Sequence, residues 1–204
     1  MAPERTIGTD AAQLQDLAVD TTGGIFAIVN GRLLSIQPGG NPDARHDVPV
    51  STPTQSLTHA IFDARGRLYY SDSTENVMLS APAASAPYHK ILNTGGSDNY
   101  LALDGDGRLY VGVNGGVVLI LSGATRGTPA ISKLVGQHTS TRTEYTEQIE
   151  GLSTDSSGKL YVSNCASDST ASVLVFAHGA RADAAPIATL AGARTGLTCS
   201  FPGR

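Results

Sequence analysis

Two structures are possible for the stretch Asp104-Gly-Asp106-Gly-Arg108-Leu-Tyr110-Val: a calcium-binding loop or a hairpin turn. The choice between them determines which fold the sequence predicts. An EF-hand loop needs oxygen ligands at its positions 1, 3 and 5, a glycine at position 6 and a glutamate at position 12. Counted from Asp104, position 5 is Arg108, position 6 is Leu109 and position 12 is Gly115. The guanidinium would repel a cation. The stretch therefore predicts a tight turn, in which Asp106 has no assigned role.

The turn belongs to a repeat with the pattern D-x-x-G-[RK]-L-Y-[VY]. Close copies begin at Asp63, Asp104 and Asp155, and a weaker copy begins at Asp20, which gives spacings of 43, 41 and 51 residues. A period of about 40–50 residues is typical of propellers and solenoids. The longest spacing contains a polar insertion, residues 137–148, which we expect to form a loop, with a short helix as the alternative.

Each repeat predicts four strands. A short apolar run before the aspartate suits a strand buried on both faces. The aspartate then accepts hydrogen bonds from the backbone of the turn, and the glycine takes a positive φ. Leu-Tyr begins the second strand, and a third strand and a weaker fourth follow. Four antiparallel strands in each repeat form a propeller blade.

We therefore predict an all-β fold, a β-propeller of four-stranded antiparallel blades in a single domain over residues 1–204. The blades lie at about 14–50, 57–92, 99–135 and 149–191, and residues 192–204 form a C-terminal tail. The four visible repeats form either a small four-bladed ring or part of a larger propeller of the six-bladed type. A closed ring predicts a monomer, whereas an open one leaves edge strands that invite a dimer.

Composition excludes some classes of protein. The net charge is −4 with only 14 Lys and Arg residues, and without a basic cluster nucleic-acid binding is not expected. No run of 18 apolar residues occurs, so no membrane-spanning helix is expected. The N-terminus lacks the basic and apolar segments of a signal peptide, and localisation stays open. Cys165 and Cys199 show no zinc-binding pattern; we expect two unpaired thiols, with a bridge from the tail to the last blade as the alternative.

The last repeat resembles the NHL-type repeats of bacterial β-propellers, and the resemblance extends over about residues 14–204. It is carried by Leu160-Tyr-Val-Ser-Asn164, Val173-Leu-Val-Phe176-Ala-His-Gly-Ala180 and Ala185-Pro-Ile-Ala-Thr-Leu190-Ala-Gly192. The resemblance implies a propeller, usually of about six blades, and export from the cell for many members. It implies no particular activity, because propellers host many unrelated functions.

Polar residues recur just before each innermost strand and in the loop after each second strand. In a propeller these positions share one mouth of the central channel, where convergent polar groups form binding sites. The candidate ligand-binding residues are Asp16, His59, Asn99, Tyr100, Glu150, Asp72 and Asn164. His59 is the candidate general base, and no other catalytic residue is assigned. The alternative is that these side chains cap the backbone of hairpins.

The segment Glu150-Gly-Leu152 is similar to the Glu-Gly opening of gluconolactonase-type, senescence-marker-like propellers. Those proteins hold a divalent metal with a glutamate, an asparagine and an aspartate. The resemblance implies Glu150, Asn99 and Asp16 as metal ligands here, with calcium or magnesium as the cofactor. Two departures weaken it: Tyr100 follows Asn99 where the family has glycine, and Asp16 lies one residue from the matching position.

Two functions remain. The leading hypothesis is a non-enzymatic NHL-like scaffold that binds a protein, peptide or glycan partner through its loop face. The alternative is a metal-dependent hydrolase of the lactonase type, with its site at the channel mouth. The repeated Tyr69, Tyr110 and Tyr161 are expected to pack between blades, not to stack on a ligand.

Overall fold

The computed structural model of the chain describes residues 14–36, 46–47, 56–74, 76–80, 89–95, 99–113, 116–122, 130–139, 148–165 and 170–199. Within these ranges the chain forms strands and one short 3-10 turn, and no α-helix occurs. None of the described residues form a helix of the length and apolarity that crossing a membrane requires.

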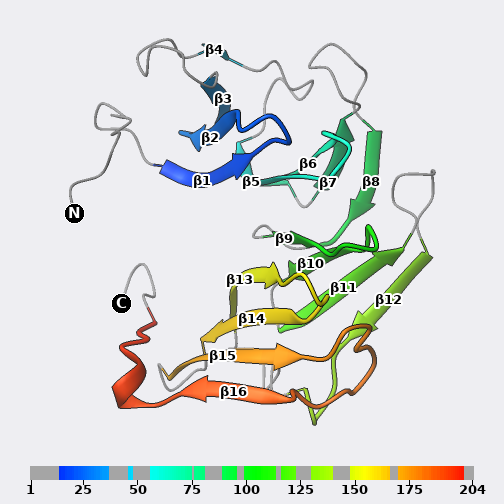
Figure 1. The fold of residues 1–204 in the computed structure, drawn as a ribbon, viewed down its shortest axis with the longest axis vertical. Helices are drawn as coiled ribbons and strands as arrows, with labels where there is room; N and C mark the ends of the chain where they lie inside the picture. The colour runs from blue at the N-terminus through cyan, green and yellow to red at the C-terminus, as the bar shows by residue number, and fades with distance from the viewer. Residues whose placement is uncertain are drawn as a thin grey trace. The chain divides into compact units, whose positions relative to one another are not determined.

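The strands can be followed along the chain in Figure 1. In chain order they are β1 (Leu14–Val19), β2 (Ile25–Val29), β3 (Arg32–Ile36), β4 (His46–Asp47), β5 (Leu57–Phe62), β6 (Leu68–Asp72), β7 (Asn76–Ser80), β8 (His89–Asn93), β9 (Tyr100–Leu103), β10 (Leu109–Val113), β11 (Val117–Ser122), β12 (Ala130–Leu134), β13 (Gln148–Thr154), β14 (Leu160–Cys165), β15 (Ala171–Phe176) and β16 (Ala188–Ala191), followed by the 3-10 turn η2 (Ala193–Thr195).

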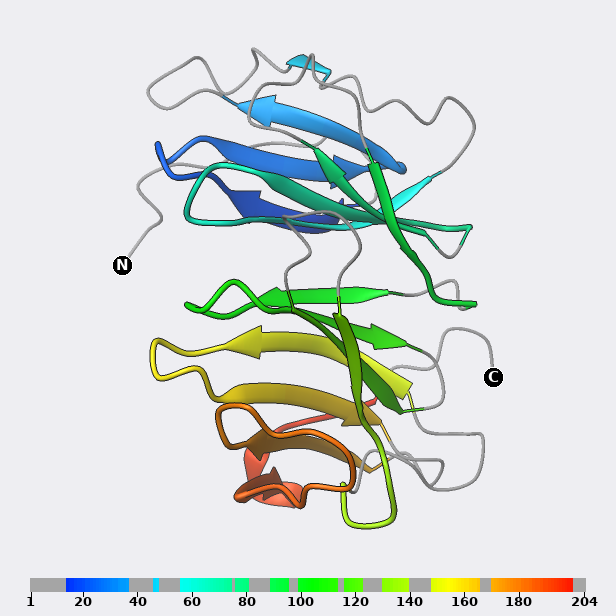
Figure 2. The ribbon, with the colours of Figure 1, turned by 90° about the vertical axis from the view of Figure 1, so that its right-hand side faces the viewer.

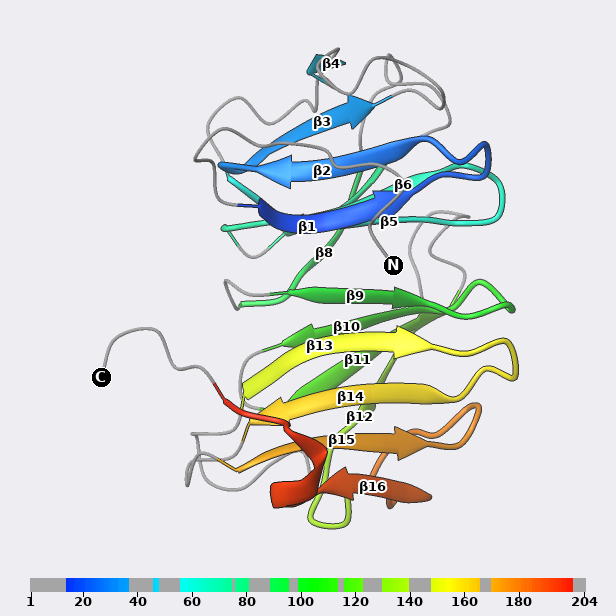
Figure 3. The same ribbon diagram turned by 60° about the vertical axis from the view of Figure 1, so that its left-hand side comes forward.

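These strands form four sheets, each of four consecutive antiparallel strands. The orders are β1-β2-β3-β4, β5-β6-β7-β8, β9-β10-β11-β12 and β13-β14-β15-β16. The labelled strands of the last sheet can be followed in sequence in Figure 3. The all-β class and the four-stranded antiparallel repeat are therefore confirmed.

The turn between the first two strands of each sheet is built as the sequence predicts. In the third sheet, Oδ1 of Asp104 accepts the backbone N–H groups of Asp106 and Arg108, and the other three sheets repeat both bonds. The turn glycines all have a positive φ between 73° and 83°. In the last sheet, the Ser157 hydroxyl and the turn's N–H groups lower the pKa of Asp155 to about 2.

The chain divides into two compact units, residues 1–93 and 94–204, each holding two sheets. In the first unit, buried Ile28 and Leu33 of one sheet pack against Leu57 and Leu68 of the next. In the second unit, buried residues of the third and fourth sheets pack face to face, among them Tyr110, Ile120, Val162 and Phe176; Figure 2 shows these sheets in green and in yellow to red.

The repeated tyrosines differ in how deeply they are buried. Tyr69 and Tyr110 are buried, and Tyr110 belongs to the core between the third and fourth sheets, which confirms packing between sheets for that residue. The Tyr110 hydroxyl donates to Asp104, and the Tyr161 hydroxyl donates to Asp155. Tyr161 is only half-buried, because it lies on the outer face of the fourth sheet.

The expectation of two unpaired thiols is wrong. Cys165 ends β14 and is bonded to Cys199, with Cα atoms 5.7 Å apart. The bridge ties the segment after η2 to the second strand of the last sheet. Sequence spacing did not reveal it, because the pairing depends on how the chain returns after β16.

We expect loss of the disulfide to lower the free energy of unfolding by about 2–4 kcal/mol, because the bridge closes a loop in the unfolded chain between residues 34 apart. Thermal unfolding with and without dithiothreitol measures this. The double variant Cys165→Ser/Cys199→Ser should unfold at the lower temperature and ignore the reductant. An equal response of wild type and double variant to dithiothreitol would contradict the role of the bridge.

Candidate functional site

A β-bulge stands at the start of the innermost strand in three sheets. The ladder skips one residue between Leu14 and Asp16 in the first sheet, and equivalent shifts occur in the second and fourth sheets. The extra residues are Gln15, Thr58 and Glu150, each five residues before the repeat aspartate. Bulges re-aim side chains and are common beside functional sites. In these three sheets, the polar residue just before or at the start of the innermost strand is therefore the extra residue of a bulge.

Two of the side chains at the bulges form hydrogen bonds within their own sheet. Oε1 of Gln15 accepts the Gly31 N–H at 2.6 Å, in the turn between β2 and β3. The Thr58 hydroxyl forms a 2.8 Å hydrogen bond with the hydroxyl of Ser71 on β6. Both contacts brace the bulge against the neighbouring strand of the same sheet.

Asp16 connects two sheets of the first unit. Its Oδ1 accepts the N–H of Leu17, and its Oδ2 accepts the N–H of Ala60 on β5 at 2.8 Å. Nδ1 of His59 lies 3.5 Å from the same Oδ2, and the two side chains are 27% and 19% exposed for Asp16 and His59 respectively. The structure thus brings together two of the predicted site residues as a carboxylate–imidazole pair.

Two polar residues next to the loops after the second strands, Asp72 and Asn30, play structural roles. Asp72 is buried at the end of β6, and its Oδ1 accepts both the N–H and the hydroxyl of Thr74. Asn30 has φ 50° and forms a two-residue turn with Gly31, which is the geometry that an Asn-Gly hairpin requires. The further loop residues Glu75, Asn114 and Asp168 lie outside the described residues.

The remaining predicted site residues lie in the second unit. Asn99 is buried just before β9, and Tyr100 is the half-buried first residue of β9. Glu150 is exposed at the bulge of β13. Asn164 is buried on β14 opposite Ile149, the residue before the bulge, and none of the residues described donates a hydrogen bond to its Oδ1.

The predicted metal ligands are divided between the units. Asp16 belongs to the first unit, and Asn99 and Glu150 belong to the second. The convergence of these three side chains on one cation therefore stays a prediction.

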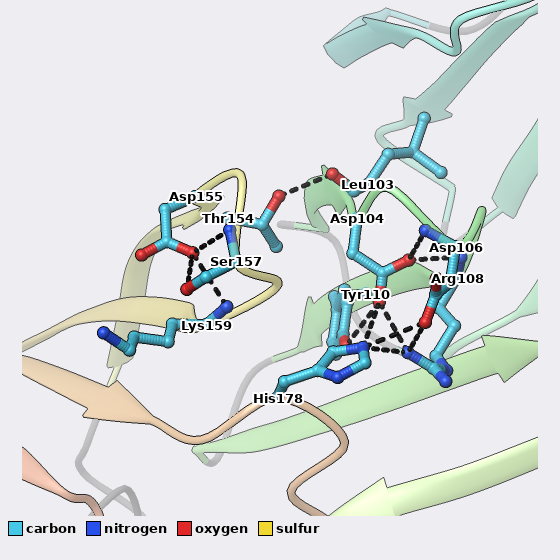
Figure 4. Close-up of polar contacts among 10 residues, drawn as sticks. All are labelled: Leu103, Asp104, Asp106, Arg108, Tyr110, Thr154, Asp155, Ser157, Lys159 and His178. Carbon is cyan, nitrogen blue, oxygen red and sulfur yellow. Dashed lines mark hydrogen bonds and ion pairs between the residues drawn. The ribbon is translucent and has the colours of Figure 1, made fainter.

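A polar cluster that the sequence did not predict lies at the opposite end of the inner hairpin of the third sheet (Figure 4). The Arg108 guanidinium lies between the other groups. Its Nη1 is 3.0 Å from Oδ2 of Asp104, 2.8 Å from Oδ2 of Asp106 and 2.6 Å from Nε2 of His178. His178 comes from the connection between β15 and β16, and its Nε2 is also 3.0 Å from Oδ2 of Asp106.

The cluster is an internal ion-pair network between the third and fourth sheets. Ligand atoms of Asp104, Asp106 and His178 lie within 4.8 Å of one another, as a metal site would require. The Arg108 guanidinium already supplies the positive charge there, so a metal ion would have to displace it. Asp106 is therefore not incidental to the turn, as the sequence suggested; it contacts a histidine 72 residues away.

His178 also leaves no room for a side chain at Gly158. A Cβ atom on Gly158, in the turn between β13 and β14, would meet Cδ2 of His178 at 2.4 Å. The imidazole therefore rests on the turn of the fourth sheet while it faces the turn of the third. The glycine is the only sign of this contact in the sequence. It does not identify the contact, because the φ of 77° in the turn already favours glycine at this position.

The network shifts the pKa of Asp104, Tyr110 and Arg108. Burial by itself would raise the pKa of the Asp104 carboxyl, but hydrogen bonds from the Arg108 backbone, the Arg108 guanidinium and the Tyr110 hydroxyl lower it. Burial and the hydrogen bond to Asp104 raise the pKa of Tyr110 to about 12. The hydrogen bond to Asp104 raises the pKa of Arg108. At neutral pH the cluster is a buried carboxylate neutralised by a guanidinium.

No protein-family model matches the chain, and no curated protein matches its sequence. Solved structures do match. A putative gluconolactonase aligns with a TM-score of 0.59 at 19% identity, over 78% of this chain and 58% of its own. Virginiamycin B lyase from Staphylococcus aureus aligns with a TM-score of 0.57 at 10% identity, over 84% and 58%. YCF48 bound to D1 peptide aligns with a TM-score of 0.53 at 10% identity, over 83% and 52%.

The chain has a β-propeller fold. The four sheets are its blades, and the predicted likeness to propellers of the gluconolactonase kind is confirmed as a distant one. At these identities the match shows the fold alone. The propeller described here spans little more than half the length of these solved chains, with coverages of 58%, 58% and 52%.

We expect Asp104→Asn to lower the free energy of unfolding by about 1–3 kcal/mol at neutral pH, because the buried network loses its charge-assisted hydrogen bonds. Since the pKa of Asp104 is lowered in the folded protein, its contribution is present above the ordinary carboxyl pKa and is lost as the pH falls through the lowered value. The difference between variant and wild type should therefore shrink in acid. Urea unfolding at neutral and acidic pH measures it.

Asp106→Asn in the same turn is the matched control. Its side chain is 55% exposed, so its ion pairs are screened by solvent and its removal should cost less than about 1 kcal/mol. Equal losses for the two variants would show that burial of Asp104 is not what makes the network stabilising.

Proposed function

We propose that this β-propeller is a non-enzymatic binding module, which holds a protein, peptide or glycan segment at the end of its blades where the innermost strands begin. The observation that carries the proposal is the use of Asp16: both of its carboxylate oxygens accept backbone N–H groups, one of them from the next blade. Asp16 therefore links two neighbouring blades of the first unit by hydrogen bonds.

The neighbouring polar groups support the same interpretation. Gln15 and Thr58 brace their bulges, and Asp72 caps its own loop. A platform held in this way keeps the loops above it in fixed positions, which is what a rigid binding scaffold requires. Catalysis or metal binding would instead need carboxylates whose oxygens point at a substrate or an ion.

Some polar groups at this end of the described blades are exposed. Glu150 and Asn30 are exposed, and the Asp16–His59 pair is partly exposed. An exposed carboxylate such as that of Glu150 favours a segment that carries basic side chains or several N–H donors. The similarity to YCF48, described as bound to D1 peptide, is an analogy at the level of the fold.

A selection of displayed peptides against the immobilised protein tests the proposal. We expect recovered peptides to be rich in Lys and Arg and to lose about tenfold or more in affinity on Glu150→Ala or His59→Ala, as for residues at the centre of an interface. Asp106→Asn, at the opposite end of the third blade, should leave affinity unchanged. Peptides that are insensitive to both site variants, or sensitive to the control alone, would refute binding at this end.

A second function is favoured by one observation in the fourth blade. Asn164 has a buried Oδ1 to which none of the residues described donates, and it pairs with the residue before the Glu150 bulge. Amide and carboxylate oxygens are the ligands that calcium and magnesium prefer. A metal-dependent hydrolase of the lactonase type would use Glu150 and Asn99, with Asp16 as the third ligand and His59 as the general base.

Thermal unfolding of chelator-treated protein with added calcium or magnesium separates the two functions. The binding module predicts no shift. The hydrolase predicts stabilisation of about 2.7 kcal/mol with the ion at about a hundred times its dissociation constant, abolished by Glu150→Gln. Asp106→Asn is again the control: a shift that this variant removes would place the ion at the Asp104 cluster and count against the hydrolase.

A further inference from the structure

Three apolar positions on the innermost strand pack on the preceding blade. They lie six, three and one residues before the repeat aspartate. In the second blade they are Leu57, Ala60 and Phe62, and all three belong to or pack against the core shared with the first blade. In the fourth blade the first of them, Ile149, is likewise part of the core shared with the third blade. In the second and fourth blades these positions therefore lie on the face turned to the preceding blade.

The first blade keeps this face apolar and exposed. The equivalent residues are Leu14, Leu17 and Val19, which are 49%, 57% and 61% exposed. The same positions in the second blade are buried or half-buried, with Leu57 at 0% and Ala60 at 7%. The sequence thus carries the residues of a blade interface at a place where the structure shows solvent.

The last blade exposes the opposite kind of face. Tyr161 pairs with Val175, and Val173 pairs with Leu190, so these side chains share the face turned away from the third blade. Tyr161, Val173 and Val175 are half-buried, and Leu190 is 55% exposed. In the third blade the matching tyrosine, Tyr110, is 2% exposed in the core shared with the fourth blade.

The two exposed faces are complementary in the way that neighbouring blades are. In the first unit, the aromatic residue six positions after the repeat aspartate contacts the residue just before the aspartate of the next blade: the rings of Phe26 and Phe62 lie 4.6 Å apart. Applied to the two exposed faces, this pairing would place Val19 against Tyr161. Neither exposed set contains a charged side chain, and contiguous apolar surface of this kind marks an interface.

We propose that the first-blade face (Leu14, Leu17, Val19) and the last-blade face (Tyr161, Val173, Val175, Leu190) dock on each other between two copies of this chain. A second copy supplies both halves of the missing interface, because each chain presents one face of each kind. The contact is heterologous, because unlike faces of the two copies meet.

Light scattering after size-exclusion chromatography, over a wide range of protein concentrations, tests the proposal. We expect a concentration-dependent dimer. Leu17→Lys and Leu190→Glu should each raise the dimer dissociation constant by about tenfold or more, since each places a charge in an apolar contact. Mixing the two variants should restore dimers, because each retains the face that the other has lost.

The control is Ile131→Lys on β12 of the third blade, an apolar residue that is 50% exposed outside both faces. It should leave the mass unchanged, and circular dichroism of every variant should match the wild type. A wild-type monomer at all concentrations overturns the proposal. So does a dimer that survives Leu17→Lys, or one that both variants abolish and their mixture does not restore, since that result indicates contact between like faces.

Discussion

Each blade depends on one carboxylate. The aspartate that ends the innermost strand accepts two backbone N–H groups of its own turn, and it does so in all four blades. This fixes the turn length and hence the register of the first two strands. A slip by one residue would turn every side chain of the strand to the other face. The turn therefore decides which residues meet the next blade.

The second oxygen of the same carboxylate extends this control to the packing between blades. In the third and fourth blades it accepts the hydroxyl of the tyrosine six residues on, Tyr110 or Tyr161. In the second blade Arg67 takes that oxygen, and the buried hydroxyl of Tyr69 has no hydrogen-bond partner among the described residues. In the third and fourth blades one anion thus satisfies the turn and also orients the aromatic ring.

The strands could be predicted because their signals are local. The repeat places an apolar run, a turn and a Leu-Tyr pair within a few residues, and each copy folded as its pattern indicates. The bulges could not be predicted, since an extra residue such as Glu150 alters neither composition nor period. The disulfide could be given only as an alternative, and the contact of His178 with Asp106 was missed, for another reason. They join residues 34 and 72 apart, and local patterns say nothing about such approaches.

The polar column was found in the sequence, but its chemistry was not. Hairpins and bulges need oxygen acceptors for their exposed backbone N–H groups, and ligand sites need the same oxygens. Asp16 shows how this is resolved: its two oxygens are directed at Leu17 and Ala60, and not at a shared point in solvent. Residue type alone does not distinguish a brace from a ligand. The direction of the lone pairs does, and that requires the bulge geometry.

The ends of a repeat array obey a different rule from its middle. Stacked repeats bury their faces on one another, so the outer faces of terminal repeats become polar in proteins that stay soluble as single arrays. The exposed face of the first blade does not follow this rule, because Leu17 and Val19 stand where the second blade buries Ala60 and partly buries Phe62. The last blade also retains Tyr161 in its repeat position. Neither face carries the polar replacement that a free surface requires, which is the physical basis of the proposed docking.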